Sequence, residues 1–447
     1  MTTGQAELKR AIGPKLLFFF VLGDVLGTGI YALTGSVAGK VGGALWLPFL
    51  LAFVVAFLTA FSYLELVGKY PRAAGAALYA NRAFGIPFLT FVIAFTVMSS
   101  GITSASAAAR AFGATYLPRS FNISVSAPVI AVVAVLFVLM LAAVNFIGVS
   151  ESVKANVVLT CIEISGLAII IGAGVYAVVF AGQGEPARLT EIDTSSSNAL
   201  LAITAATSLA FFAMVGFEDS VNMAEECQDP PRIFPRALLS GLAVAALIYV
   251  LVAVTSSLLL PADFLAGVKS DALLEVIKVG APAFPLRLFA FIGLFAVVNS
   301  ALINMLMASR LLYGMANEGI LPKAFGTVHP FRRTPWVAIL FTTAIAAVLV
   351  ATAGADGVSR LGGTTGLLLL LVFTVVNVAV LVLRRETVPH QHFRAPTWAP
   401  VVAAVLCGYL SVPFLSGRPA SDYLIALILV GVGILLWVVN RRFVRAA

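Results

Sequence analysis

The feature that most constrains this chain is an apolar segment interrupted by glycines at its centre. Residues 23–30 read Gly-Asp-Val-Leu-Gly-Thr-Gly-Ile, and a counterpart much later, residues 211–218, reads Phe-Phe-Ala-Met-Val-Gly-Phe-Glu. A helix that unwinds inside a bilayer leaves backbone N–H and C=O groups unpaired, which is tolerated only where they line a cavity or hold a ligand. Two such breaks in corresponding segments predict a transporter of small molecules.

Composition places the chain in a membrane, because 61% of its residues are hydrophobic and only 11% are charged. Apolar runs of about 20 residues are long enough to cross a bilayer as helices. The sequence therefore predicts an all-α integral membrane protein. The predicted spans, twelve in all, cover residues 14–39, 43–68, 85–114, 125–147, 155–181, 198–224, 233–260, 284–316, 335–354, 362–383, 397–416 and 421–440.

The distribution of basic residues predicts the orientation. If both termini are cytoplasmic, roughly two thirds of the 28 Lys and Arg residues lie in or beside cytoplasmic segments. We therefore expect a multi-pass protein of the cell (plasma) membrane, with its N and C termini in the cytoplasm. The net charge of +8 then reflects topology, and nothing in the sequence indicates nucleic-acid binding.

Cysteine and histidine give no sign of catalysis or metal binding. The three cysteines show no disulfide or metal spacing, and the three histidines, His329, His390 and His392, fall in predicted cytoplasmic loops. No nucleophile motif is present either. We expect no cofactor and no metal, and we do not expect an enzyme.

The positions of the two breaks, in spans one and six, predict an internal repeat. Residues 1–181 and 198–383 would form two halves of five spans each, the five-plus-five inverted repeat of LeuT-type folds, with broken helices 1 and 6. Residues 397–440 would add the peripheral helices 11 and 12. The whole chain, 1–447, is then a single transporter domain.

At the first break, Gly27-Thr28-Gly29 is the strongest candidate for binding. Glycine lets the helix unwind, so that free N–H groups and the dipole of the second half-helix point at an anion, such as a substrate carboxylate. The alternative is close helix packing, because Gly23 and Gly27 form a GxxxG pair. The residues also spell a dinucleotide fingerprint, but no strand precedes it and its place is mid-bilayer.

The second break supplies the complementary half of the site. Unwound carbonyls there could accept hydrogen bonds from a substrate ammonium group, and Phe212 could close over the substrate as an aromatic gate. The alternative for Phe212 is an ordinary core or lipid-facing side chain. The segment that carries these groups consists of Phe212, Ala213, Met214, Val215 and Gly216.

Four acids lie within spans, with no Lys or Arg in the middle third of any helix to pair with them. An ionised carboxylate costs about 2.5 to 3.5 kcal/mol at the membrane centre even on the lenient insertion scale. These acids must face water, bind a cation or stay protonated. A hydrogen bond to nearby backbone, Ser or Thr groups is expected for Asp219 and is the alternative for Glu218. Coupling roles are expected for Asp24, Glu163 and Glu218.

Two stripes of small polar residues are further candidates, although such residues usually hold membrane helices together. One stripe lies on span three and the other on span eight, where Ser300 and Asn304 are candidate substrate contacts. The full stripes are Ser99, Thr103, Ser106 and Arg110, and Ser300, Asn304 and Met307.

Taken together, these motifs resemble the amino acid-polyamine-organocation superfamily of transporters over nearly the whole of spans one to ten. The matching residues are Gly27-Thr28-Gly29-Ile30, Glu65, Pro71, Ala74, Gly75, Tyr79, Gly216-Phe217-Glu218, Glu225-Glu226, Asp229-Pro230-Pro231-Arg232, Ser309-Arg310, Gly319-Ile320-Leu321-Pro322 and Thr334-Pro335. The resemblance implies the LeuT-type fold and amino-acid or amine substrates. It also implies carboxylate capture at the first break, including Ile30, amine capture at the second, and a gate at Phe212.

One position departs from the family. Many relatives carry a Lys in span five where sodium-driven cousins bind an ion, and Glu163 aligns there. An acid at this position could couple transport to protons without sodium, or it could recognise a cationic substrate. Acidic substrates are disfavoured under both of these roles for Glu163.

The sequence therefore predicts a secondary active transporter of amino acids or amines that works by alternating access, proton-coupled or as an exchanger. A transporter-derived amino-acid sensor and a polyamine or amine exchanger are the alternatives, and a membrane enzyme or a channel fits less well. The expected partners are the substrate, protons and the lipid bilayer. The particular substrate and the oligomeric state stay open.

Overall fold

The computed structural model describes residues 12–72, 75–147, 152–195, 198–317 and 321–444, and it is helical, with no strand in these ranges. Ala74, Gly319 and Ile320, which contribute to the family motifs, lie outside the described residues. Ten segments of the described chain are long and apolar enough to cross a membrane. The helices that form them are α1 (Pro14–Val25) with α2 (Thr28–Val41), α3 (Trp46–Lys69), α5 (Pro87–Ala111) with η1 (Phe112–Tyr116) and α6 (Leu117–Phe121), α7 (Ala127–Ile147), α8 (Ser152–Val179), α9 (Ala199–Ala210) with η3 (Phe211–Met214) and η4 (Phe217–Glu226), α10 (Pro230–Leu259), α13 (Leu286–Asn317), α15 (Gly357–Leu383) and α18 (Ala420–Val444).

Two further apolar helices, α14 (Trp336–Thr352) and α16 (Trp398–Ser411), are shorter than these ten. They lie where spans nine and eleven are predicted. Each predicted span thus coincides with an apolar helix in the described part of the chain, and ten of these meet the length expected for a membrane crossing.

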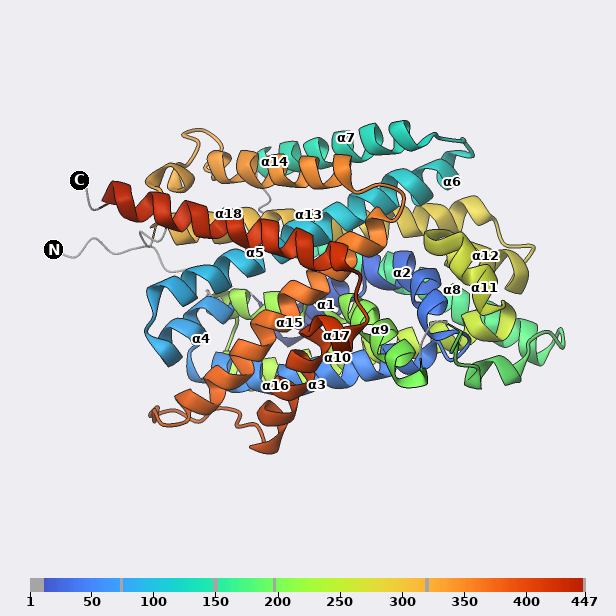
Figure 1. Cartoon of the computed structure of the whole chain (residues 1–447), viewed down its shortest axis with the longest axis horizontal. Coiled ribbons are helices and arrows are strands. Elements are labelled where there is room, and N and C mark those ends of the chain that lie inside the picture. The colour runs from blue at the N-terminus through green and yellow to red at the C-terminus, as the bar shows by residue number, and fades with distance from the viewer. Residues whose placement is uncertain (1–11, 73–74, 148–151, 196–197, 318–320, 445–447) are drawn as a thin grey trace.

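The connections between spans hold structure that the sequence did not fully predict. Helix α4 (Gly75–Phe84) fills the connection before α5. The connection before α13 holds α11 (Ala262–Val268), a 3₁₀ turn η5 (Lys269–Asp271) and α12 (Ala272–Gly280), and Lys269, between the two helices, has a positive φ of 49°. In Figure 1, α4 lies at one end of the molecule, α11 and α12 lie at the other, and α18 ends on the side of α4.

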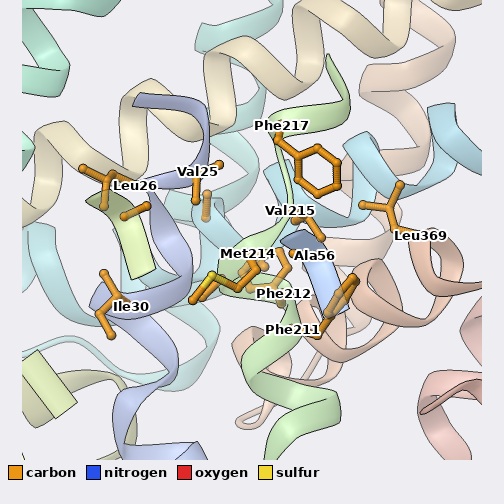
Figure 2. Packing of buried hydrophobic residues seen from close by; sticks show 14 of the residues in the cluster. Val25, Leu26, Ile30, Ala56, Phe211, Phe212, Met214, Val215, Phe217 and Leu369 are labelled. Atoms are coloured by element: carbon orange, nitrogen blue, oxygen red, sulfur yellow. The ribbon is translucent and has the colours of Figure 1, made fainter. Parts of the chain in front are cut away.

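Both predicted breaks are present in the backbone. Helix α1 ends at Val25 and α2 begins at Thr28, with Leu26 and Gly27 between them. The second broken segment passes from α9 through the 3₁₀ turn η3 to an extended residue, Val215, and continues as the 3₁₀ segment η4. Figure 2 shows the side chains of the two breaks side by side, with Val25, Leu26 and Ile30 from one and Met214 and Val215 from the other.

Burial separates a central set of helices from a peripheral set. The most apolar stretch of the α1–α2 segment is 83% buried and that of the α9–η4 segment is 72% buried, whereas the corresponding values for α7 and α18 are 28% and 22%. A helix that is apolar on all sides but exposed on most of them faces lipid. The two broken segments therefore lie at the centre of the bundle, where irregular backbone is shielded from lipid.

Candidate functional site

A cavity of about 1130 Å³ begins at the two breaks and extends toward the end of the molecule where α4 lies. Its inner wall includes Thr28, Gly29 and Gly216, and its mouth includes Asn81 of α4 and Arg333, which follows α13. A volume of this size exceeds that of a typical ligand pocket for a small molecule, as expected for a site with an open access path.

The first break presents the N-terminus of α2 to this cavity. The first N–H groups of a helix have no acceptor within the helix, and Gly27, at the N-cap position, offers no side chain to cap them. Thr28 and Gly29 line the cavity, and the Thr28 hydroxyl is buried without a hydrogen-bond partner among the described residues. These donors and the helix dipole form a site suited to an anionic group.

The other end of the first break is held by Tyr249 of α10. Its hydroxyl donates a hydrogen bond of 2.6 Å to the Val25 carbonyl, one of the last carbonyls of α1. A carbonyl at a helix end has lost its partner within the helix, so this bond replaces it. The sequence does not single out Tyr249, because nothing in its surroundings distinguishes it from a core tyrosine.

Close packing and binding both contribute to the pattern of glycines. A Cβ atom at Gly29 would lie 2.4 Å from the Cα atom of Ala213, so only glycine lets α2 approach the second break this closely. A Cβ atom at Gly23 would overlap Thr160 of α8, and one at Gly27 would lie 3.0 Å from the Ser300 Cβ atom of α13. Gly23 and Gly27 therefore also allow other helices to pack closely against the first break.

At the second break, Gly216 has a φ of 119°, a conformation open in practice only to glycine. The Gly216 N–H donates a hydrogen bond of 2.8 Å to a carboxylate oxygen of Glu218. The side chain of Glu218 therefore stabilises the backbone of the second break. A Cβ atom at Gly216 would lie 2.8 Å from the backbone carbonyl of Asp24, so the two breaks are in direct contact.

Phe212 lines the cavity and is 4% exposed. Its ring packs against α15, where a Cβ atom at Gly362 would lie 3.2 Å from the ring. The side chain thus closes the cavity on the side of α9 and α15. This position is compatible with a gate.

The cavity is rich in acids near the breaks and holds bases only near its mouth. Asp24, Glu218 and Asp219 line it, and one oxygen of Asp24 is buried with no hydrogen-bond partner among the described residues. The basic lining residues are Arg310 and Arg333, on and beyond the last turns of α13. No described residue forms an ion pair with any of the three acids.

Polar residues of α5 and α13 complete the wall. Ser300 and Asn304, the candidate substrate contacts of α13, line the cavity together with Ser100 and Ser104 of α5. The predicted stripe on α5 is displaced by one residue: Thr103 instead bonds Thr365 of α15 at 2.7 Å between the two hydroxyls. Two polar faces run side by side along α5, and the spacing of residues alone does not tell which one faces the cavity.

Glu163 lies apart from the cavity, fully buried in α8. Asn299 of α13 donates to one of its carboxylate oxygens at 3.2 Å, and the Tyr31 hydroxyl donates to its backbone carbonyl at 2.8 Å. The second carboxylate oxygen has no partner among the described residues, and neither Lys nor Arg pairs with this acid there. The Asn299 amide also donates to Asn156 at 3.0 Å, so Glu163 belongs to a buried polar cluster between α8 and α13.

The structure therefore separates the candidate residues into two groups. Gly27, Thr28, Gly29, Phe212, Gly216, Ser300, Asn304, Asp24 and Glu218 share the cavity wall. Ile30, Ala213 and Met214 are buried behind that wall, and Glu163 occupies the separate cluster.

Comparison with known proteins gives the class of this chain. The family model for amino acid permeases matches residues 12–437, nearly the whole length. The chain belongs to the amino acid permease family, within the amino acid-polyamine-organocation superfamily, and is a multi-pass membrane protein. The resemblance inferred from the motifs is thereby confirmed.

Individual relatives are similar along most of their length. The methylthioribose transporter of Bacillus subtilis is 28% identical over 98% of this chain and 94% of its own. The branched-chain amino acid permease of the same organism is 24% identical over 86% of this chain and 83% of its own. Cationic amino acid transporter 9 of Arabidopsis thaliana, a chloroplastic protein, is 26% identical over 74% of this chain and 59% of its own.

Proposed function

We propose that this permease is a secondary active transporter of amino acids or related amines that works by alternating access. One observation carries the proposal: the two backbone breaks meet at the inner end of a single cavity, in the centre of the bundle. Irregular backbone at this depth exposes donors and acceptors together, as capture of a zwitterion requires.

The proposed architecture is a five-plus-five inverted repeat of residues 1–181 and 198–383, followed by two additional helices, twelve in total. Its support is the placement of the breaks in the first and sixth apolar segments and the even number of segments. With the termini in the cytoplasm of a plasma-membrane protein, the open mouth beside α4 faces inward. The described conformation is then inward-facing.

The opposite end of the molecule is closed by packing and by ion pairs. A Cβ atom at Gly35 of α2 would lie 2.4 Å from the backbone oxygen atoms of Leu265 and Lys269, so α2 and the α11–η5 segment are in tight contact. The Lys269 ammonium lies 2.6 Å from the Asp356 carboxylate, before α15. Arg119 and Asp271 form a second ion pair at this end. Opening to the outside requires these contacts to separate.

In the proposed binding mode, the N–H groups at the start of α2 and the Thr28 hydroxyl hold the substrate carboxylate. The backbone between Phe212 and Gly216 receives the ammonium group, and the three nearby acids offer further oxygen acceptors. An anionic side chain would find no basic partner at this end of the cavity, because the lining bases lie near its mouth. We therefore propose a neutral or cationic substrate, in agreement with the range of names among the relatives.

Glu163 is proposed to couple transport to protons, independently of sodium. Its absence from the cavity wall disfavours direct recognition of the substrate, while its contact with Asn299 links it to α13 and its contact with Tyr31 links it to α2. Gain or loss of a proton by its carboxyl group would change the hydrogen bond from Asn299 and so the contact between α8 and α13, the helix that carries Ser300 and Asn304 of the cavity wall.

A transporter-derived sensor and an exchanger of polyamines or amines are the competing proposals. A thermal-shift screen of amino acids and polyamines on the purified protein addresses binding first, because a ligand at about 100 times its dissociation constant adds roughly 2.7 kcal/mol of stability. Counterflow of each hit in proteoliposomes then addresses movement. A sensor is stabilised by its ligand but does not transport it. An amine exchanger binds and transports compounds that lack a carboxylate.

Replacing Phe212 with Ala is expected to reduce transport more than equilibrium binding. The ring closes the cavity against α15, so its loss impairs occlusion more than initial capture of the ligand. We expect a transport rate at least about tenfold lower with a dissociation constant within about threefold of wild type. Equal losses in both measurements would make Phe212 a substrate contact or a folding residue. Phe211→Ala, one residue earlier and absent from the cavity wall, is the matched control.

A further inference from the structure

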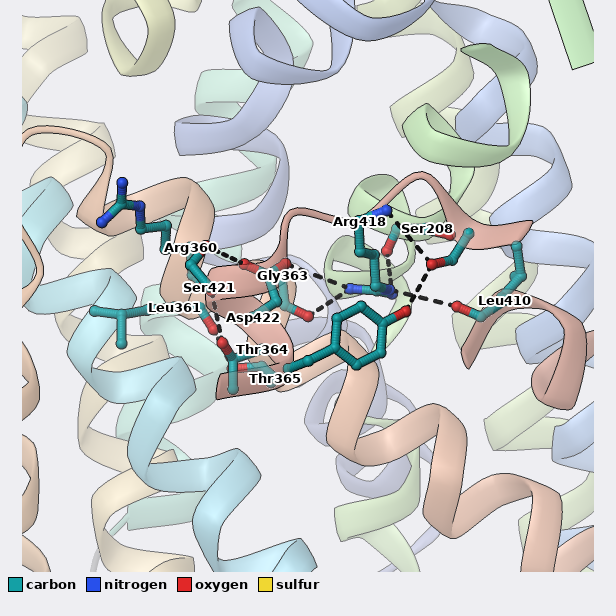
Figure 3. Close-up of polar contacts among 12 residues, drawn as sticks. Ser208, Arg360, Leu361, Gly363, Thr364, Thr365, Leu410, Arg418, Ser421 and Asp422 are labelled. Carbon is teal, nitrogen blue, oxygen red and sulfur yellow. Dashed lines mark hydrogen bonds and ion pairs between the residues drawn. The ribbon is translucent and has the colours of Figure 1, made fainter. Parts of the chain in front are cut away.

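The loop between α16 and α18 places a buried arginine inside the bundle. After the short helix α17 (Pro413–Ser416), Gly417 and Arg418 turn the chain toward α18. The Arg418 side chain is only 2% exposed, although it belongs to the connection between two helices that the sequence predicts to be peripheral. Figure 3 shows its guanidinium group surrounded by backbone carbonyls from other helices.

These carbonyls come from three different helices. The guanidinium donates to Gly363 O of α15 at 2.5 Å and to Ser208 O of α9 at 2.6 Å. A longer bond of 3.4 Å reaches Leu410 O of α16. The nearest carboxylate, that of Asp422, lies 4.0 Å away, so most of the hydrogen-bonding capacity of Arg418 is used on backbone oxygens. A planar guanidinium can reach several acceptors at once, and lysine cannot reproduce that arrangement.

The two short bonds join the segments that meet at Phe212. Ser208 belongs to the last turn of α9, where carbonyls lack partners within the helix. Phe212 follows directly in η3, and its ring lies against Gly362, next to Gly363. A Cβ atom at Gly366, one turn further along α15, would lie 3.4 Å from the guanidinium and 3.6 Å from the Phe212 amide. Arg418 thus sits where the end of α9, the aromatic ring and α15 converge.

We infer that Arg418 is a positioning residue for transport: it fastens the end of α9 to α15 and so holds Phe212 across the closed end of the cavity. The inference rests on the proposed gate role of Phe212. It makes the α16–α18 connection a part of the transport machinery. Arg418 is not among the residues that line the cavity, so it acts through the segments that it joins.

Hydrogen–deuterium exchange on the full-length protein in detergent tests, without any ligand, whether Arg418 fastens the end of α9 to α15. Arg418→Ala is expected to speed exchange of amides in residues 208–215 by at least about fivefold, with a smaller rise in residues 357–370 and none in α3. Arg418→Lys should give an intermediate rise, because it keeps the charge but not the fork of donors. The matched control is Arg360→Ala, since Arg360 is exposed and joins the bonds in Figure 3 through its backbone carbonyl.

The inference is overturned if exchange in residues 208–215 is unchanged, or if it rises equally in α3, which would indicate general destabilisation. Uptake of a mixture of the twenty ¹⁴C-labelled L-amino acids into proteoliposomes provides the second readout. Arg418→Ala should slow uptake at least about tenfold, and uptake at the wild-type rate with faster local exchange would refute a role in transport. If the wild-type protein takes up none of the mixture, the proposed amino-acid transport fails, and the exchange experiment still decides the fastening.

Discussion

Replacing Gly29 with Val is expected to abolish ligand binding while the protein still inserts into the membrane. A Cβ atom at this position would lie 2.4 Å from the Ala213 Cα atom, so the larger side chain must push the two breaks apart. Overpacking of this kind costs about 1 to 3 kcal/mol. Because 1.4 kcal/mol is a factor of ten in affinity, binding should weaken by about 5- to 140-fold from packing alone, with the loss of carboxylate contacts added.

Ligand-induced thermal stabilisation measures this effect, with Gly172→Val as the matched control. Gly172 lies in α8 with open space around its Cβ position, so the same substitution should leave binding unchanged there. Thr28→Val provides a variant of unchanged shape that removes only the cavity-lining hydroxyl, and it should weaken binding by about tenfold or less. Normal affinity in both Gly29→Val and Thr28→Val would refute the site at the first break.

Replacing Glu163 with Gln is expected to abolish uptake driven by a pH gradient while exchange of substrate persists. Gln keeps the shape of the side chain and can still accept the hydrogen bond from Asn299, but it cannot gain or lose a proton at neutral pH. Uptake with an inward proton gradient and counterflow without one should be compared in the same proteoliposomes. We expect gradient-driven accumulation to fall to the background level and counterflow to stay within about threefold of wild type.

Two results would contradict this role of Glu163. Loss of binding of cationic ligands alone, with proton-driven uptake of neutral ones intact, would assign Glu163 to recognition. Accumulation driven only by sodium, in wild type and variant alike, would exclude proton coupling. Glu275→Gln, which changes an acid of α12 paired with Lys278, is the control for the substitution itself.

The sequence predicts the breaks well because glycine and acidic residues in apolar spans have few structural explanations. Its placement of the first break is shifted slightly: the backbone leaves the helix at Leu26 and Gly27, and Gly29 already lies in the first turn of α2. Glycines that permit a turn and glycines that permit close packing look alike in a sequence. For Gly29, the short distance to Ala213 shows that close packing is the reason for glycine.

The parts that the sequence misses depend on contacts between distant segments. Tyr249 and Arg418 resemble ordinary core and loop residues until their hydrogen bonds to Val25 and Ser208 are known. Both bind carbonyl groups at helix ends, and these acceptors carry no residue-specific signal. In the same way, periodicity identifies a polar face on α5 but does not tell which of two neighbouring faces meets the cavity.

Counterflow in proteoliposomes that contain the purified wild-type protein tests transport through the cavity most directly. Vesicles are loaded with one unlabelled amino acid or amine at a time, and entry of the same labelled compound is followed without any ion gradient. Alternating access at the two breaks predicts transient, saturable accumulation of at least one neutral or cationic amino acid, and its loss in Gly29→Val. Entry that never saturates, or no accumulation of any compound that stabilises the protein, would contradict alternating access through the cavity at the two breaks.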